Sequence, residues 1–413
     1  MNKKKLFKRE NYLSKIRGFY HANDLIKVIT GVRRCGKSSI LQMISQELLD
    51  EGISEKQIAF IDLEKRGFKS IRSPEELEEL IDKSFKGVKK TKYLFIDEIQ
   101  KVKGFEEVIN AFRAEDDYSI FITGSNSYLL SGELMTLLTG RYLEFEIFPL
   151  TFEEYIGMKK FYKMPIDEIP QRELDKYITQ GGFPRTLFFD SDIEKRAYIQ
   201  GLVDEIYKKD IKRRVKIKNV STFNIVRDYI INNYGASISI NNIVSDLNKS
   251  GIPIRGNTVA KYVQHLLDAK LLYECDRFDM KSRRMLSGEK KYYLADLSLT
   301  CITNPDSRIN YGPALENIVY IYARSKNYEV SVGRIGKLEC DFILKDIWLN
   351  YSYVQVAYTI LNSKDTEDRE YTPLELIKDN YPKYVVTTDF LIQKRNGIKH
   401  VNIFEFVKNG ELF

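Results

Sequence analysis

The chain has 413 residues, of which 43% are hydrophobic and 30% are charged, and its formal net charge is +7. This length exceeds one ordinary hydrophobic core, so we expect two to four domains. No apolar run approaches the ~20 residues that a membrane-spanning helix needs. The basic start at residues 1–5 is not followed by the apolar core of a signal peptide, so we expect a soluble, cytoplasmic protein.

The cysteine content and the net charge limit which metal sites, disulfides and binding partners the chain can be expected to have. The four cysteines, Cys35, Cys275, Cys301 and Cys340, are not spaced as metal ligands, and the chain has only three histidines. A structural zinc site or a disulfide framework is therefore not expected. The mild positive charge permits binding to nucleic acid without requiring it.

A phosphate-binding loop is the strongest motif. Residues 31–38 fit the pattern G-x-x-x-x-G-K-[ST]. An aliphatic segment at 25–30 predicts a buried strand before the loop, and residues 39–49 predict a helix after it. In this context the loop amides and the helix N-terminus would hold the phosphates of ATP. The expected nucleotide-binding residues are Gly31, Val32, Arg33, Arg34, Cys35, Gly36, Lys37, Ser38 and Ser39.

Further along the chain, strands are predicted at residues 58–62 and 93–98, and the second of them ends in Asp97 and Glu98. Asp97 would hold Mg²⁺ together with Ser38, and Lys37 would bridge the β- and γ-phosphates. Glu98 would polarise the attacking water as a general base. The combination predicts hydrolysis of ATP with Mg²⁺.

Two further positions are candidates for catalysis. A strand predicted at 119–123 leads into a polar turn, where Asn126 or Ser125 could sense the γ-phosphate, or the turn could simply cap the next helix. Arg141 could be an arginine finger, in its own chain or toward a neighbour in a homo-oligomer, or an ordinary surface arginine.

These motifs together resemble one protein family. They are Gly-Val-Arg-Arg-Cys-Gly-Lys-Ser at 31–38, Phe-Ile-Asp-Glu at 95–98, Thr-Gly-Ser at 123–125, Gly-Arg at 140–141, Pro-Leu-Thr-Phe-Glu-Glu-Tyr at 149–155, Gly-Gly-Phe-Pro at 181–184 and Lys-Tyr-Tyr-Leu-Ala-Asp at 291–296. The chain resembles the prokaryotic AAA-type ATPases that carry a C-terminal domain of unknown function. The resemblance implies ATP hydrolysis and an ASCE-type sheet, with the strand of Thr123 between the strands of Thr30 and Asp97.

The middle of the chain is predicted to be helical. Residues 151–215 predict a helical lid, in which Arg185 could reach the nucleotide or be a solvated arginine. The basic run at 208–214 could contact nucleic-acid phosphates, although such runs are usually solvated helix faces.

Residues 216–302 predict three helices followed by a β-hairpin, the order of a winged helix. Such a domain could insert its third helix into the major groove of double-stranded DNA and touch phosphates with its wing. It could equally be a module that binds a protein partner. The expected DNA contacts are Lys261, Tyr262, Gln264, Lys281, Arg283 and Arg284.

Residues 303–413 alternate helix and strand in an order that resembles the restriction-endonuclease fold. A nuclease of that fold would hold Mg²⁺ with Glu316, Asp341 and an E-x-K motif. The E-x-K positions are here Gln355, Val356 and Ala357. We therefore expect a nuclease-like domain without nuclease activity, in which Arg369 and Glu370 could form a substitute polar cluster.

The sequence thus predicts an α/β chain in four parts. They are a P-loop AAA+ ATPase core at 1–150, a helical lid at 151–215, a winged helix at 216–302 and an inactive nuclease-like domain at 303–413. Three functions stay open at this point. The first is an ATP-driven switch or motor acting on DNA or a protein, the second is an ATP-gated DNA-binding regulator with little turnover, and the third, disfavoured, is an ATP-controlled nuclease.

Overall fold

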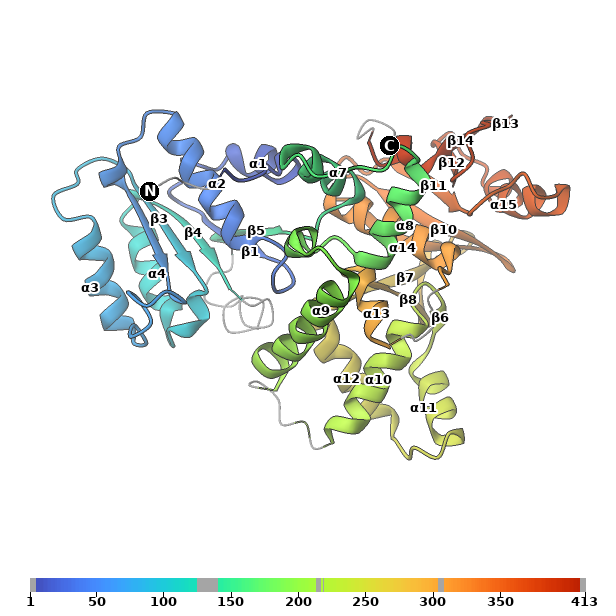
Figure 1. Ribbon diagram of the computed structural model, residues 1–413, viewed down its shortest axis with the longest axis horizontal. Coiled ribbons are helices and arrows are strands. Elements are labelled where there is room, and N and C mark those ends of the chain that lie inside the picture. The colour runs from blue at the N-terminus through green and yellow to red at the C-terminus, as the bar shows by residue number, and fades with distance from the viewer. Residues whose placement is uncertain (1–4, 125–139, 213–216, 218, 304–307, 409–413) are drawn as a thin grey trace. The chain divides into compact units, whose positions relative to one another are not determined.

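The computed structural model describes residues 5–124, 140–212, 217, 219–303 and 308–408. The chain divides into two compact units, Met1–Phe148 and Pro149–Phe413 (Figure 1). Among the described helices, none combines the length and the apolar character that a bilayer crossing needs.

The first unit is built on a parallel sheet. Its described strands lie in the order β2-β3-β4-β1-β5, and every pair is parallel. The strands are β1 (Ile26–Thr30), β2 (Ile58–Asp62), β3 (Lys92–Asp97), β4 (Tyr118–Thr123) and β5 (Tyr142–Glu146). Since β4 lies between β1 and β3, the sheet order that the family resemblance implied is confirmed.

Helices cover this sheet, as expected for parallel strands, which are buried on both faces. The helical segments are α1 (Glu10–Arg17), α2 (Lys37–Asp50), η1 (Glu55–Gln57), α3 (Pro74–Ser84), η2 (Ile99–Lys101) and α4 (Phe105–Ala114). Helices α3 and α4 lie together and share one apolar core with the sheet (Figure 1). Helix α3 begins at a capping box formed by Ser73 and Glu76, with Pro74 in its first turn, which is a start that the sequence predicts.

One carboxylate fastens the N-terminal helix to the helix that follows the phosphate loop. Glu47 of α2 accepts hydrogen bonds from Arg17 (2.8 Å), the Tyr20 hydroxyl (2.8 Å) and Lys8 (3.1 Å). The hydrogen bond from Arg17 is the main reason that the pKa of Glu47 falls to about 2. The segment before β1 is therefore part of the folded unit and packs on α2.

The second unit combines helices with a mixed sheet. Its helical segments are α7 (Phe152–Phe161), α8 (Pro170–Gln180), η3 (Pro184–Phe188), α9 (Asp192–Ile206), η4 (Tyr207–Ile211), α10 (Val220–Asn232), α11 (Ile240–Lys249), α12 (Gly256–Asp268), η5 (Leu297–Leu299), α13 (Thr300–Thr303), α14 (Tyr311–Ser325), α15 (Lys364–Leu376) and α16 (Ile403–Phe406). Its strands are β6 (Ser237–Ile238), β7 (Leu272–Asp279), β8 (Arg284–Leu294), β9 (Glu329–Ile335), β10 (Leu338–Lys345), β11 (Tyr351–Val356), β12 (Lys383–Thr387), β13 (Lys394–Arg395) and β14 (Ile398–Asn402).

All of these described strands belong to one sheet, in the order β13-β14-β12-β11-β10-β9-β7-β8-β6. Strand β7 pairs in parallel with β9 through Arg277 and Val332. The hairpin β7–β8, from the predicted winged helix, therefore shares a sheet with the strands of residues 303–413. The three boundaries between the predicted domains stay predictions, but hydrogen bonding is continuous across the one at residue 302.

Candidate functional site

The predicted phosphate loop connects β1 to α2, and its shape depends on glycine. Gly31 and Gly36 have φ angles of 135° and 113°, in the left-handed range that glycine adopts without strain. A Cβ atom at Gly31 would lie 2.0 Å from the Ile147 carbonyl oxygen, so no other residue fits there. The Lys37 ammonium donates to the carbonyl oxygens of Gly31 (2.8 Å) and Val32 (3.2 Å), which holds it against the loop.

The other predicted loop residues differ in exposure. Val32 and Cys35 are buried, and burial raises the pKa of the Cys35 thiol, in keeping with a packing role. The partly or fully exposed members are Arg33, Arg34, Ser38 and Ser39.

The two predicted metal ligands lie together. Asp97, at the end of β3, is 3% exposed, and its carboxylate accepts hydrogen bonds from the hydroxyls of Ser38 and Thr123. Burial raises the pKa of Asp97, and these two hydroxyls partly offset the rise. A carboxylate and a hydroxyl are oxygen donors of the kind that Mg²⁺ prefers.

This donor set is small, which also fits Mg²⁺. The described residues hold no cluster of three or more His, Cys, Asp or Glu side chains arranged for a metal ion. Mg²⁺ is commonly bound by one or two protein oxygens together with substrate phosphates and water. Ser38 and Asp97 would therefore hold it jointly with a nucleotide.

Glu98 has an unusual backbone. Its φ of 60° puts a non-glycine residue in the left-handed region, a conformation that is rare and often found at functional sites. Its backbone N–H donates to the Thr123 hydroxyl (3.1 Å), and its carboxylate accepts from the Gln100 amide (2.7 Å). Thr123 thus contacts both predicted acids. Its Thr-Gly-Ser motif was noted in the sequence, but no role for its hydroxyl was predicted.

A buried arginine next to the phosphate loop was also missed. Arg9 is 3% exposed, and its Nη1 donates to the carbonyl oxygens of Cys35 (3.0 Å) and Phe148 (2.9 Å). The Phe148 N–H in turn donates to the Tyr12 hydroxyl (3.2 Å). One guanidinium therefore joins the phosphate loop to the last residue of the first unit. A single arginine in a basic N-terminal stretch gives no signal of this role.

Arg141 lies away from the phosphate loop of its own chain. It immediately precedes β5, and its carbonyl accepts from Ile26 at the start of β1. Since β1 and β5 are parallel and the loop follows the end of β1, Arg141 is at the opposite end of the sheet. Its Nη1 donates to Asn110 (3.4 Å). A finger acting within the chain does not fit this position. A finger acting toward a neighbour and an ordinary surface arginine both stay open as predictions. Asn126 and Ser125 lie outside the described residues.

One predicted DNA contact is wrong. Tyr262 on α12 is 7% exposed and packs edge-to-face on Phe223, with its hydroxyl 3.4 Å from the Asn219 carbonyl oxygen. It is a core residue and cannot face a groove. The remaining predicted contacts are exposed, and they are Lys261, Gln264, Lys281, Arg283 and Arg284.

The predicted nuclease-like positions gather around a lysine that was not predicted. The Lys291 ammonium of β8 lies 3.0 Å from Glu316, 2.9 Å from Glu339 and 3.7 Å from Asp341. Its side chain is only 6% exposed. Burial lowers the pKa of Lys291, but the three carboxylates outweigh this and raise the pKa overall. An ammonium therefore stands among the acids that would hold a metal in a nuclease.

The substitute cluster that the sequence suggested does form. The Gln355 amide donates to Glu370 (3.0 Å), and its oxygen accepts from the Asp341 N–H (3.3 Å). Arg369 donates to Glu370 (2.9 Å). Ala357 belongs to an apolar core, so the lysine position of the E-x-K motif contains no polar group.

Two family motifs contact one another in the second unit. Asp296 ends the 291–296 motif and accepts a hydrogen bond from the Gly182 N–H (2.7 Å). The Gly182 carbonyl accepts from the Leu150 N–H (2.7 Å). Burial raises the pKa of Asp296 to about 6. Leu150, at the start of the second unit, is therefore hydrogen-bonded to the turn at 181–184. The same turn is hydrogen-bonded to Asp296, which follows β8 in the chain.

Comparisons with known proteins agree with the first unit's geometry. The family model for an AAA domain matches residues 23–156, and a model for a domain of unknown function (DUF8612) matches residues 171–307. In the solved Walker-type ATPase of Pyrococcus abyssi, the fold is similar with a TM-score of 0.50 at 15% identity, over 72% of this chain and 96% of that one.

Two curated relatives extend over most of the chain. An uncharacterized protein of Methanocaldococcus jannaschii is 31% identical over 379 residues, which cover 86% of this chain and 79% of that protein. An uncharacterized protein of Haemophilus influenzae is 33% identical over 407 residues, which cover 98% of this chain and 99% of that protein. The chain therefore belongs to the same family as the Haemophilus influenzae protein and carries an AAA domain.

Proposed function

We propose that this protein is an Mg²⁺-dependent ATPase of the AAA+ type. The observation that carries the proposal is that the hydroxyls of Ser38 and Thr123 both donate to the Asp97 carboxylate, and that Thr123 also accepts a hydrogen bond from the Glu98 N–H. The AAA domain match supports the same reaction.

Each residue has a role in this reaction. Lys37 binds the β- and γ-phosphates, and Ser38 and Asp97 hold Mg²⁺. Bound Mg²⁺ would neutralise negative charge on the phosphates. Glu98 accepts the proton of the attacking water, and the hydrogen bond from the Gln100 amide helps to hold its carboxylate in place.

Hydrolysis is proposed to change how the two units are arranged. Arg9 joins the phosphate loop to Phe148, and the second unit begins at the next residue. Leu150 is in turn bound to the turn at Gly182. A change in the phosphate loop on hydrolysis would therefore alter the contact between Arg9 and Phe148. Only Pro149 separates Phe148 from Leu150, which is bound within the second unit. Since β6–β14 share one sheet, these strands would move together.

Double-stranded DNA is the partner that we propose first. The order of α10, β6, α11, α12, β7 and β8 is that of a winged helix. Exposed cationic residues at the turn between β7 and β8 would contact phosphates, and they are Lys281, Arg283 and Arg284. A protein partner is the alternative, and a DNA-binding regulator with little turnover is the second candidate function. Nuclease activity is disfavoured, because the E-x-K positions are Gln355, Val356 and Ala357, and Ala357 lies in an apolar core.

Steady-state ATPase assays test the proposal. We expect Glu98→Gln to reduce kcat at least about a hundredfold, which is typical for loss of a general base, and double-stranded DNA to stimulate the wild type. Gln100→Ala is the control, because it removes only the neighbour that donates to Glu98. Stimulation that falls as salt rises would indicate phosphate contacts. A wild type without turnover, with and without DNA, would reject the ATPase and leave a nucleotide-binding regulator.

A further inference from the structure

Two β-hairpins of the second unit end side by side at one edge of its sheet. Strands β7 and β9 are parallel neighbours, and Asp279 near the end of the first is paired with Arg334 near the end of the second. Each strand then turns back into an antiparallel partner, β7 into β8 and β9 into β10. The turns at residues 280–283 and 336–337 therefore project from the same edge of the sheet. The first turn belongs to the predicted wing, and the second belongs to the predicted nuclease-like domain.

Basic side chains gather on both hairpin ends. Residues 279–285 and 334–338 together contain five basic side chains and one acidic one. All five basic side chains are exposed, and in the described part of the chain none of them forms an ion pair with a carboxylate. We call this set the cationic ridge, and it consists of Lys281, Arg283 and Arg284 on the first hairpin and Arg334 and Lys337 on the second.

Two acids beside the ridge leave most of its charge unbalanced. Glu339 of β10 is already engaged in ion pairs with Arg277 (2.8 Å) and Lys291 (2.9 Å). Asp279 closes the first turn by accepting from the backbone N–H of Ser282 (2.6 Å). Its single negative charge can balance one of the five cations at most. The ridge therefore has an excess of positive charge at the surface.

Both hairpin turns are fixed by hydrogen bonds. In the first turn, the Arg283 N–H donates to the Asp279 carbonyl (2.8 Å). In the second turn, Nε of Arg334 donates to the Gly336 carbonyl (3.1 Å). This contact leaves the Nη groups of Arg334 for other acceptors, and phosphate oxygens are acceptors that guanidinium groups bind strongly. The ridge is thus held in place before any partner binds.

The distance between the two hairpins fits the phosphates of a duplex. Neighbouring strands lie about 4.8 Å apart, and two such steps separate the middle of β7–β8 from the middle of β9–β10, which is about 10 Å. One DNA strand carries a phosphate about every 3.4 Å along the helix axis, so this distance spans about three phosphates. The two hairpins can therefore contact the same DNA strand.

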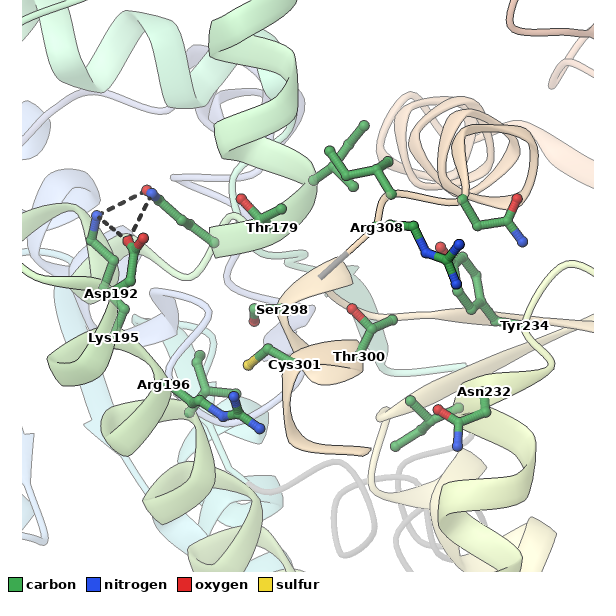
Figure 2. A pocket seen from close by; sticks show the side chains of 16 residues that line it. Thr179, Asp192, Lys195, Arg196, Asn232, Tyr234, Ser298, Thr300, Cys301 and Arg308 are labelled. Atoms are coloured by element: carbon green, nitrogen blue, oxygen red, sulfur yellow. Dashed lines mark hydrogen bonds and ion pairs between the residues drawn. The ribbon is translucent and has the colours of Figure 1, made fainter. Parts of the chain in front are cut away.

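A cavity in the same unit is too small to be an alternative site for a duplex. It has a volume of about 420 Å³ and lies among helices α8, α9, α10 and α13 (Figure 2). A cube of this volume has an edge of about 7.5 Å, whereas the major groove of a duplex alone is about 12 Å wide. Figure 2 also shows Lys195 in this cavity beside Asp192, which lies 3.8 Å from it and balances its charge.

We propose that the cationic ridge holds the sugar-phosphate backbone of double-stranded DNA, with Arg334 and Lys337 acting as a second wing beside the first. This inference rests on the proposed DNA partner and adds the C-terminal region to the contact surface. Contacts from basic side chains to phosphates position a duplex without reading its sequence. The region that lacks the E-x-K residues of a nuclease would thus contribute to binding and not to cleavage.

The salt dependence of DNA binding tests the second wing. Binding of the full-length protein to a fluorescent duplex is measured by anisotropy between about 50 and 200 mM salt. Each lost phosphate contact reduces the slope of log K against log salt concentration by about 0.9. We expect Arg334→Gln and Lys337→Gln each to lower the slope by about this amount, and the double variant to lower it by about 1.8. Arg334→Lys preserves the charge and should retain most of the slope.

Lys378→Gln is the matched control. Lys378 is exposed and precedes β12, whose start lies at the opposite edge of the same sheet, because β12 and β9 run in the same direction. This variant should keep the wild-type slope. Unchanged melting temperatures would show that the variants are folded, and their ATPase activity without DNA should equal that of the wild type.

The possible outcomes separate this inference from the proposed function. A wild-type slope in the Arg334→Gln/Lys337→Gln variant overturns the second wing, and a lower slope in Lys281→Gln/Arg283→Gln would then show that the first wing binds DNA alone. A wild type that binds no duplex overturns both the ridge and the DNA partner, and binding of poly-glutamate instead would indicate an acidic protein. The ATPase proposal is judged separately, from turnover without DNA.

Discussion

The Thr123 hydroxyl donates a hydrogen bond to the Asp97 carboxylate, and the same oxygen accepts one from the N–H of Glu98. Thr123, the last residue of β4, thereby contacts the proposed metal ligand at the end of β3 and the backbone of the proposed general base that follows it. The contact follows from the sheet order, since β3 and β4 are paired neighbours and both end at the same edge.

Thr123→Val should impair hydrolysis more than folding. The change preserves the side-chain shape but removes a hydrogen bond to a charged group, which is worth about 1.5–3 kcal/mol. We expect kcat/KM for ATP to fall roughly ten- to a hundredfold. Thr123→Ser keeps the hydroxyl and should retain most activity. Equal activity of the valine variant and the wild type would contradict the role assigned to Thr123.

Asp97→Asn should remove the stabilisation that Mg²⁺ adds to ATP binding. Burial raises the pKa of Asp97 above 3.8, so its contribution to stability is greatest below that pH and is lost as pH rises through the raised pKa. Without metal at neutral pH, the asparagine variant should therefore melt no lower than the wild type. Thermal melts with ATP, with and without Mg²⁺, check this. Asp62→Asn, at the paired position on β2, should keep the Mg²⁺ effect.

Arg9→Met should weaken ATP binding. The variant leaves the buried carbonyls of Cys35 and Phe148 without this donor. Each unsatisfied carbonyl costs about 1–3 kcal/mol of free energy. We expect the Kd for ATP to rise about tenfold or more. Arg9→Lys can still donate and should recover part of the affinity. A lower melting temperature with unchanged affinity would indicate that Arg9 only stabilises the fold.

Stability should depend on pH through Lys27. This lysine is fully buried in β1, where its ammonium donates to the carbonyls of Ala22 and Leu25 and to Ser119. Burial lowers its pKa from 10.5 to about 7. Between these values the unfolded chain binds more protons, so the free energy of unfolding should rise with pH from about 7 to 10.5. Urea denaturation at several pH values should give this rise, and Lys27→Met should flatten it.

Lys291→Met should destabilise the second unit strongly. The variant leaves the buried Asp341 and the partly exposed Glu316 and Glu339 without their shared cation. Loss of one partner of a buried pair typically costs about 3–5 kcal/mol, and the partial exposure of the two glutamates places the expected loss at the lower end of that range. Lys290→Met is the matched control. Because the Lys290 side chain is more exposed, its replacement should lower the free energy of unfolding less than that of Lys291. The double variant Lys291→Met/Glu316→Gln should recover part of the loss, measured by denaturant unfolding. Equal losses for the two lysines would contradict the cluster's importance.

The sequence by itself determined the phosphate loop and the acidic end of β3, whereas the order of the parallel sheet was implied by the resemblance to a known family. These features depend on residues that are close in the sequence, because the pattern of a glycine turn or of a strand ending in acids spans only a few positions. Helix α2 begins at Lys37, two residues before the predicted start at residue 39. The sequence also suggested Arg369 and Glu370 as part of a substitute polar cluster, and the structure adds Gln355 to it.

Only the tertiary structure decided which distant residues meet. Arg9 reaches Cys35 and Phe148 across 26 and 139 positions, and Lys291 reaches Glu316 across 25. Tyr262 has a helical position that the sequence allowed to face DNA, but packing on Phe223 buries it. Contacts of this kind depend on sheet order, register and helix rotation. Many residue pairs could satisfy the same local pattern, and only the packed core selects among them.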